Sequence, residues 1–289
     1  NHYTHFVEGV HCEVEASAEN NFMPTAEDIA PHIKDAVILA LCSPQNPTGT
    51  TFTKEALEAI CDMVLEENKR RGAGEKKLYV LYDQMYWQLT YGDIRHYDPV
   101  SLRPQMKAYT VYIDAISKCF AATGVRVGWA MGPEAIMSKM KAILSHVGAW
   151  APMAEQKAVA RFLLQYDDIN NYLQHFKAEI SLRLQKIYNG FMRLKAEGLP
   201  VDAIAPQAAI YLTVRVTARG MKTTSEQLLE QQKDVTGYLL NEAGIALVPF
   251  YAFGASKDSS WYRLSVGACK KEEIDAMIEA LAQALRKLK

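Results

Sequence analysis

The sequence predicts an α/β protein with a mostly parallel sheet flanked by helices, followed by a smaller α+β domain. Strand-like and helix-like segments alternate between residues 36 and 132, which is typical of parallel strands joined by right-handed helical crossovers. A long helical pattern follows, and the remaining residues mix strands and helices. We therefore expect a large domain over residues 1–185 and a small C-terminal domain over residues 186–289.

The composition excludes several classes of protein. Hydrophobic residues make up 49% of the 289 residues and charged residues 22%, so a sizeable core can form. The net charge of −1 lacks the basic excess typical of nucleic-acid binding, and no apolar run is long enough to cross a membrane. The five cysteines are odd in number and widely spaced, which indicates neither a disulfide framework nor a zinc site and favours the reducing cytoplasm.

The elements of the first half follow from local patterns. Residues 36–42 are continuously apolar, as expected of a strand buried on both faces. An amphipathic helix comes next, with Thr53 as its predicted N-cap and a basic C-terminal turn before Gly72. Further strands are predicted at residues 78–82, 109–113 and 125–131, so this half forms one sheet.

The second half begins with a helical pattern from residue 154 to about residue 199, long enough to bridge two domains. We expect strands at residues 209–216, 245–248 and 261–266, and a helix at 225–242. The last helix carries apolar residues in register from Ile274 to Leu285, with acids before bases as the helix dipole favours.

Polar side chains follow three of the predicted strands, at the sheet edge where ligands bind in open α/β folds. Asn46-Pro-Thr-Gly49 follows the first strand, Asp83 and Tyr86 follow the second, and Ser117-Lys118 follows the third, with Arg126 eight residues later. Lys118 lies between two apolar segments, where partial burial would favour the nucleophilic free amine. The sequence therefore predicts one site at this edge.

With Arg263-Leu-Ser265 near the end of the chain, these motifs resemble the class I/II pyridoxal-phosphate-dependent aminotransferases of fold type I. The likeness is closest to the aspartate aminotransferase branch. It implies pyridoxal 5'-phosphate as cofactor, an amino acid and a 2-oxo acid as substrates, and a homodimer whose subunits share site residues across the interface.

The resemblance also implies a role for each matched residue. Lys118 would hold the cofactor aldehyde as a Schiff base and carry the proton to and from the substrate Cα. Asp83 would keep the pyridine nitrogen protonated, so that the ring accepts electrons. The remaining residues would bind the cofactor oxygens or the substrate carboxylate: Asn46 and Tyr86 the phenolic oxygen, Ser117 and Arg126 the phosphate, and Arg263 with Asn46 the α-carboxylate.

Two positions depart from the family pattern. Ala115 stands where a hydroxyl or glycine is usual, so we expect one phosphate hydrogen bond fewer. Phe250 replaces the glycine that usually follows the proline at this point, so we expect a different turn there. For Tyr251 and Phe253, a place in the substrate pocket and a place in the core both remain open.

The match begins downstream of the family's N-terminal segment. In the family this segment supplies a second phosphate-binding loop, an aromatic residue that stacks on the cofactor, and a residue that reaches the partner subunit's site. The resemblance therefore predicts that the full-length protein is an aminotransferase and that this 289-residue piece is not active alone.

Several alternatives remain open. The expected reaction moves an amino group between an L-amino acid, aspartate in the first place, and a 2-oxo acid such as 2-oxoglutarate. The same cofactor and lysine would serve a decarboxylase or a lyase, and the fold also serves as the ligand-sensing module of transcription regulators. A dicarboxylate needs a second arginine, for which Arg95, Arg103, Arg215 and the neighbouring subunit are all candidates. No metal is needed by this chemistry, and none is expected.

Overall fold

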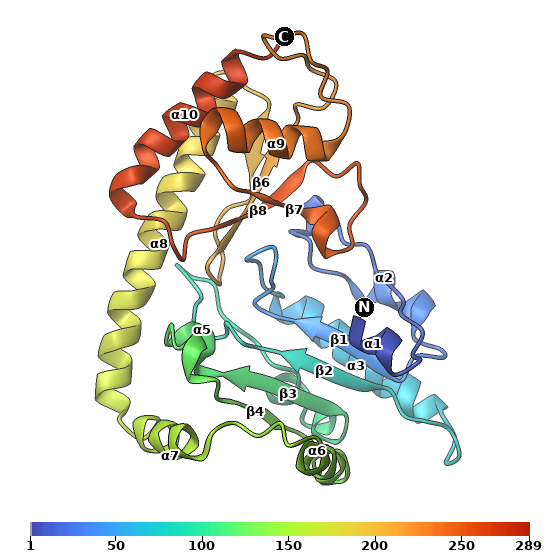
Figure 1. The fold of residues 1–289 in the computed structure, drawn as a ribbon. Helices are drawn as coiled ribbons and strands as arrows, with labels where there is room; N and C mark the ends of the chain where they lie inside the picture. The colour runs from blue at the N-terminus through green and yellow to red at the C-terminus, as the bar shows by residue number, and fades with distance from the viewer. Residues whose placement is uncertain (1) are drawn as a thin grey trace.

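The computed structural model describes residues 2–289 and contains two four-stranded sheets joined by a long helix (Figure 1). The first sheet has the strand order β1-β2-β3-β4 and the second has the order β5-β6-β8-β7. The α/β class with a mostly parallel first sheet is confirmed. The helices are α1 (His2–Phe6), α2 (Ala26–Ile29), α3 (Lys54–Arg70), α4 (Pro99–Leu102), α5 (Ile116–Cys119), α6 (Glu134–Val147), α7 (Met153–Phe162), α8 (Tyr166–Ala196), α9 (Gln232–Ala243) and α10 (Ile274–Arg286).

The first sheet comprises β1 (Ile38–Cys42), β2 (Tyr79–Asp83), β3 (Thr110–Ala115) and β4 (Gly128–Met131). The first three strands are parallel and β4 pairs antiparallel to β3. Helix α3 begins at its predicted cap, where the Thr53 hydroxyl accepts a hydrogen bond from the Ala56 N–H. Its apolar residues are buried in one cluster with Val80 and Tyr82 of β2, so α3 covers one face of the sheet.

The opposite face of this sheet is more open, so the prediction that residues 36–42 form a strand buried on both faces is wrong. Side chains alternate between faces along a strand, and those of Ile38 and Ala40, which share a face with Asp83, are exposed, Ile38 by 60%. Val80 and Tyr82 on the α3 face are at most 1% exposed. The Asp83 side chain, at the end of β2, therefore lies on the less covered face of the sheet.

The second sheet comprises β5 (Val201–Ala203), β6 (Tyr211–Val216), β7 (Val248–Pro249) and β8 (Trp261–Ser265), all paired antiparallel. Helices α8, α9 and α10 bury their apolar faces in one cluster with it. Helices α8 and α10 approach closely at Gly190, where an added Cβ would lie 2.7 Å from the Ile278 side chain. The same cluster includes Tyr86, Leu89 and Tyr91 from the segment after β2, so this core also joins the two parts.

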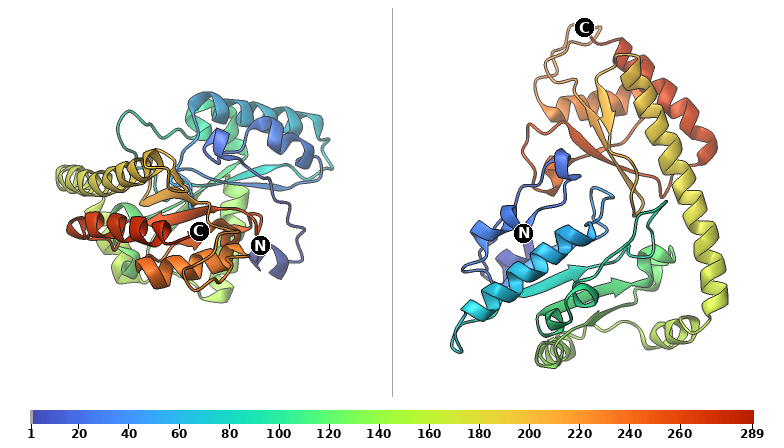
Figure 2. Two further views of the ribbon diagram at one scale, coloured as in Figure 1. Left: turned by 90° about the horizontal axis from the view of Figure 1, so that it is seen from above. Right: turned by 180° about the vertical axis from the view of Figure 1, so that it is seen from behind.

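Helix α8 runs beside both sheets (Figures 1 and 2). It is 31 residues long, and the expected boundary between residues 185 and 186 falls within it. Its N-terminal half is beside the first sheet and its C-terminal half packs on the second (Figure 2). The helix therefore bridges the two parts, as its length predicts.

Four predictions about the bounds of elements are wrong. The strand expected at residues 125–131 begins only at Gly128. The helical pattern from residue 154 is interrupted at residues 163–165, where the chain turns between α7 and α8. Residues 225–231 are not helical, because Thr223 accepts hydrogen bonds that close a turn and the helix begins only at the capping box of Gln231 and Asp234. The strand expected at 245–248 is reduced to Val248 and Pro249. Helix α6 was not anticipated.

Among residues 2–289, no helix has both the length and the apolar character that a membrane span requires.

Candidate functional site

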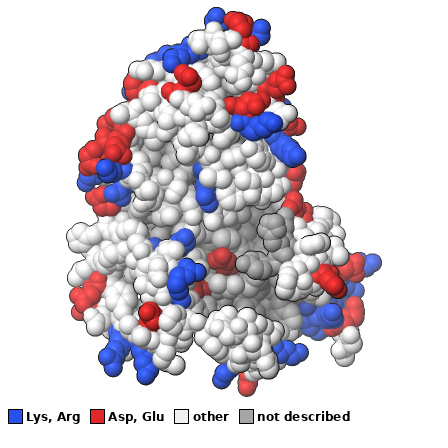
Figure 3. All heavy atoms as spheres, viewed as in Figure 1, with Lys and Arg blue, Asp and Glu red and all other residues white. Residues whose placement is uncertain are grey.

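The three parallel strands end together at one edge of the first sheet. Cys42 is aligned with Asp83, and Asp83 with Ile113. The segments that carry Asn46, Tyr86 and Lys118 leave the sheet from this edge. The molecule is hollowed between its two parts, with basic and acidic atoms both visible on the walls of the hollow (Figure 3).

The Asn46-Pro-Thr-Gly49 turn is tied to strand β6 of the other sheet. The Thr213 hydroxyl donates to the Thr48 carbonyl at 2.7 Å, and the Ala208 N–H donates to the Gly49 carbonyl at 2.9 Å. Gly49 has a φ of +72°, and an added Cβ would overlap the carbonyl oxygen of Tyr211. Only glycine combines this conformation with such a close approach, so the motif fixes the two sheets against each other.

Asn46 and Arg263 meet across the two parts. The Arg263 Nη1 donates to Asn46 Oδ1 at 2.9 Å. The guanidinium contacts two aromatic rings, 4.7 Å from the centre of the Tyr211 ring and 4.9 Å from that of Phe253. Phe253 is 42% exposed, so its ring faces the surface as well as Arg263. A guanidinium held in this way can bind a carboxylate with its remaining N–H groups.

Asp83 and Tyr86 occupy a partly desolvated region. Burial raises the pKa of Asp83, and a hydrogen bond from the Met85 N–H at 3.0 Å offsets only part of this effect. Tyr86 is 3% exposed and its hydroxyl lies 2.7 Å from that of Tyr211. Burial, with smaller contributions from Tyr211 and Asp83, raises the pKa of Tyr86, so the Tyr86 phenol is protonated near neutral pH.

Ser117 and Lys118 lie in the single turn of α5, which Ile116 and Cys119 anchor in the interior. Both residues are half-buried. Thr123 connects this turn to the exposed Arg126, because its hydroxyl donates to the Ser117 carbonyl at 3.0 Å and its carbonyl accepts from Arg126 Nη1 at 3.0 Å. The structure therefore places Lys118 and Arg126 on one compact loop after β3.

The two positions that depart from the family pattern are closely packed. Ala115 pairs with Gly128 of β4, and a Cβ added at Gly128 would lie 3.1 Å from the Ala115 methyl carbon. Phe250 is 4% exposed and packs edge-on against Phe22, with ring centres 5.1 Å apart. The segment from Phe250 to Phe253 forms a 3-10 turn.

Sequence reasoning missed two residues of this region. Tyr211 was placed in a predicted strand but was not singled out. Asp114 is 5% exposed and accepts hydrogen bonds from Trp87 Nε1 at 2.9 Å and from the Ala115 N–H at 2.7 Å. Burial raises the pKa of Asp114 to about 6. The only available signal was an acid within the apolar strand that leads to Lys118.

The candidate residues differ in how directly they meet. Direct contacts connect Asn46, Arg263, Tyr211 and Tyr86. Asp83 and the α5 loop share the edge, and in residues 2–289 no hydrogen bond joins Asp83 to Lys118. Two of the arginines considered for a side-chain carboxylate are already paired, Arg103 with Glu58 and Asp62, and Arg215 with Asp202.

A cavity of about 1260 Å³ lies elsewhere, between the β2–β3 connection, β4 and α8. Its lining includes Trp87, Lys177 and Arg95, the third arginine considered for a side-chain carboxylate, and none of the residues expected to bind the cofactor or the α-carboxylate. The hydrogen-bonding groups at the strand edge nevertheless suit pyridoxal phosphate. They comprise an amine for an aldehyde, a carboxylate for a pyridinium, a phenol and an amide for a phenolic oxygen, and a hydroxyl and a guanidinium for a phosphate.

Comparison with known proteins gives consistent results. The model of the family "Aminotransferase class I and II" matches residues 2–281. An aspartate aminotransferase of Bacillus sp. strain YM-2 is 31% identical over 251 residues, which are 86% of this chain and 58% of that protein. A probable aspartate/prephenate aminotransferase of Rhizobium leguminosarum bv. phaseoli is 28% identical, over 90% of this chain and 61% of that protein.

Solved structures agree. The crystal structure of an aspartate aminotransferase from Rhizobium meliloti has a TM-score of 0.84 at 26% identity and covers 99% of this chain and 67% of its own. That of an aromatic aminotransferase from Pyrococcus horikoshii OT3 has a TM-score of 0.82, also at 26% identity, and covers 96% of this chain and 67% of its own. The chain spans about three fifths of the length of the curated relatives it matches.

Proposed function

The chain belongs to the class I and II aminotransferases, and from this we propose that the full-length protein moves an amino group between an L-amino acid and a 2-oxo acid. Aspartate and 2-oxoglutarate are the substrates we propose first, because named aspartate aminotransferases are among its relatives. The family depends on pyridoxal phosphate, which supplies an electron sink for the carbanion formed at the substrate Cα.

One observation carries this proposal: the hydrogen bond of 2.9 Å between Asn46 and Arg263, which are 217 residues apart in sequence. Both residues come from motifs with proposed roles in substrate binding. Their contact brings an amide and a guanidinium together beside the strand edge that also carries Asp83 and Lys118. Such a pair can orient the substrate carboxylate beside a cofactor held at that edge.

Each remaining residue has a defined chemical task in this proposal. Lys118 would bind the cofactor aldehyde, and its amine would move the proton at Cα. Asp83 would hold the proton of the pyridine nitrogen, and the protonated Tyr86 would donate a hydrogen bond to the phenolic oxygen. Ser117 and Arg126 would bind the phosphate from one loop. The more open sheet face at Asp83 also supports the proposal that the 289-residue chain alone is not a competent enzyme.

We propose further that the protein acts as a homodimer. Helix α6 and the segment after it expose apolar side chains, 62% of Ile143, 70% of Val147 and 49% of Trp150. An exposed apolar patch of this kind is typical of an interface between protein chains. A second copy of the chain is the partner that the family resemblance suggests.

Covalent trapping tests the cofactor assignment. The full-length protein incubated with pyridoxal phosphate and reduced with borohydride is expected to carry the cofactor on the peptide that contains Lys118. Lys118→Ala should abolish the adduct, because the bond requires that amine, while Lys141→Ala on the exposed side of α6 should leave it unchanged.

Trapped cofactor on Lys118→Ala would contradict the lysine assignment. Product analysis then separates the reactions, since transamination yields a 2-oxo acid from the amino donor, whereas decarboxylation releases carbon dioxide and elimination releases ammonia. A 289-residue chain as active as the full-length protein would contradict the proposal about the shorter chain.

A further inference from the structure

Tyr211 touches both halves of the proposed site. It begins β6 in the second sheet and is 6% exposed. Its hydroxyl lies 2.7 Å from the Tyr86 hydroxyl, and the two rings meet at 70° with centres 5.6 Å apart. The face of its ring carries the guanidinium of Arg263 at 4.7 Å. One side chain therefore joins the proposed cofactor-binding phenol to the proposed carboxylate-binding arginine.

The hydrogen bond between the Tyr211 and Tyr86 hydroxyls affects where the Tyr86 proton can point. Each phenol has a single O–H proton, so only one of the two hydroxyls donates to the other. If Tyr211 donates to the Tyr86 oxygen, the proton of Tyr86 stays available for an acceptor on its other side. A phenol that accepts one hydrogen bond also becomes a stronger donor in the next, because bonds in a chain polarise one another.

The ring of Tyr211 has a second effect. The Arg263 guanidinium lies over the face of this ring, and also over that of Phe253 at 4.9 Å. Nε of Arg263 is buried without a hydrogen-bond partner among the described residues. The two rings therefore contribute strongly to the orientation of this guanidinium, together with its bond to Asn46.

We propose that Tyr211 is a positioning residue for the reaction, an inference that rests on the proposed function. Its hydroxyl donates to Tyr86 and directs the Tyr86 proton to the phenolic oxygen of bound pyridoxal phosphate. Its ring holds Arg263 for the substrate carboxylate. The two effects belong to different atoms of one side chain, so different substitutions separate them.

The experiment uses the full-length protein loaded with pyridoxal phosphate and measures two quantities. The first is the midpoint of the pH titration of the bound cofactor's absorbance. The second is the dissociation constant of succinate, a dicarboxylate probe that does not react. Tyr211→Phe removes the hydroxyl and keeps the ring, whereas the matched control Phe253→Leu removes the other ring and leaves both hydroxyls in place.

Tyr211→Phe is expected to raise the titration midpoint by about 0.5 pH unit, because a weaker hydrogen bond from Tyr86 stabilises the deprotonated phenolic oxygen less. Its succinate dissociation constant should stay within about twofold of that of the unmodified protein. Phe253→Leu should raise the dissociation constant of succinate about threefold to tenfold, because the cation–π contact with Arg263 is lost. It should leave the titration midpoint unchanged. Tyr211→Leu should show both effects.

An unchanged midpoint in Tyr211→Phe, or an equal shift in Phe253→Leu, would overturn the positioning role while leaving the proposed function standing. Failure of the unmodified protein to hold pyridoxal phosphate on Lys118 would instead defeat the proposed function itself. Thermal melts of each variant keep a loss of folding distinct from both results.

Discussion

Asp114 shows how a single buried residue can influence the segment that carries Lys118. Its carboxylate is buried near the end of β3, just before α5, and two hydrogen bonds only partly offset the effect of burial on its pKa. The nearby Asp83 adds a smaller effect of the same sign to the pKa of Asp114. The neutral form of Asp114 is thus favoured in the folded protein more than in the unfolded chain.

This imbalance predicts a pH dependence of stability. The folded pKa of about 6 lies above the ordinary value of 3.8, so the free energy of unfolding should fall as the pH rises from about 4 to about 6 and then stay level. Asp114→Asn removes the buried charge and should stabilise the protein by up to about 3 kcal/mol at pH 8 and by little at pH 4. Urea unfolding at both pH values measures the difference.

The exposed Asp93 provides the control for this experiment. Asp93→Asn should change the free energy of unfolding by less than about 0.5 kcal/mol at either pH. If Asp114→Asn changes the free energy of unfolding equally at pH 4 and pH 8, the Asp114 carboxylate does not titrate between these values.

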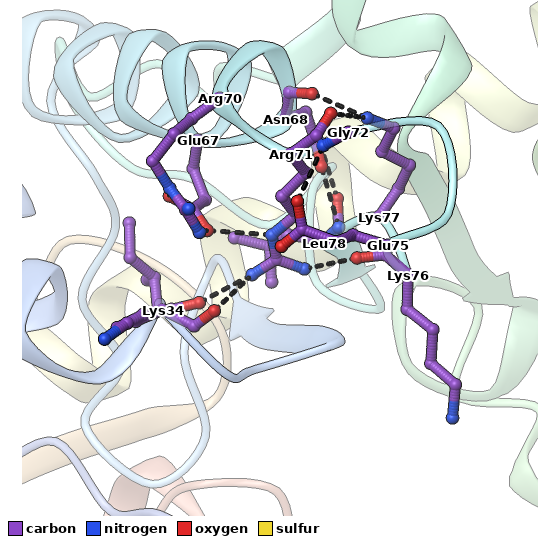
Figure 4. A network of polar contacts seen from close by, with 11 residues as sticks. Lys34, Glu67, Asn68, Arg70, Arg71, Gly72, Glu75, Lys76, Lys77 and Leu78 are labelled. Carbon is purple, nitrogen blue, oxygen red and sulfur yellow. Dashed lines mark hydrogen bonds and ion pairs between the residues drawn. The ribbon is translucent and has the colours of Figure 1, made fainter.

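At the scale of elements, the C-terminus of α3 is held to the chain that precedes β1 by one buried arginine (Figure 4). Arg71 Nε donates to Glu67 Oε1 at 2.7 Å, and its other nitrogens donate to the carbonyls of Lys76, Ile33 and Lys34. The side chain of Arg71 is only 3% exposed. This network joins α3, the turn before β2 and the segment before β1, and so fixes the frame on which β1 and β2 present their polar ends.

Arg71→Met should therefore destabilise the protein by about 3 to 5 kcal/mol, because it leaves Glu67 and three carbonyls without their buried partner. Arg70 is the matched control, since it also pairs with Glu67 but is 51% exposed. Arg70→Met should cost less than about 1 kcal/mol. Equal losses in the two variants, measured by urea unfolding at pH 7, would contradict the structural role of Arg71.

The pKa of Glu67 gives a second readout of the same network. Hydrogen bonds from Arg70 and then Arg71 lower the pKa of Glu67 to about 2. Because the pKa of Glu67 is lower in the folded protein than its ordinary value of 4.5, ionised Glu67 stabilises the fold at pH values above about 4.5. This contribution is lost as the pH falls from about 4.5 toward about 2. The acid limb of the stability curve should accordingly be shallower in Arg71→Met.

At the scale of the whole molecule, the arrangement leaves an apolar surface without a partner in the described chain. Helix α6 has no buried residue, although it carries Ile143, Val147 and other apolar side chains. It lies at the end of the first part that is remote from the second sheet (Figure 1). A surface of this kind fits the proposed homodimer.

Charge placed on this surface should weaken the dimer. Ile143→Glu buries a carboxylate in the interface and should raise the dissociation constant of the full-length protein at least tenfold, equivalent to about 1.4 kcal/mol. Ser138→Glu adds the same charge at another exposed position of α6 and should have little effect. Sedimentation velocity over a range of concentrations measures both, and an Ile143→Glu dimer as tight as the unmodified one would place the interface elsewhere.

The sequence by itself determined the α/β class, the order of most elements and the polar residues at the ends of three strands. These features depend on the apolar period, on caps such as Thr53 and on the edge that parallel strands share, all of which are local in the chain. The family motifs at Asn46, Lys118 and Arg263 are likewise short, and each can be recognised in the sequence without knowledge of its tertiary contacts.

Only the tertiary structure decided which of these residues touch. Tyr86 and Tyr211 are 125 residues apart and Asn46 and Arg263 are 217 apart, and no local pattern encodes such pairs. The burial that raises the pKa of Asp114 likewise comes from packing across β3, β4 and Trp87. Long-range contacts depend on how two sheets pack against each other, and that packing is a property of the whole chain.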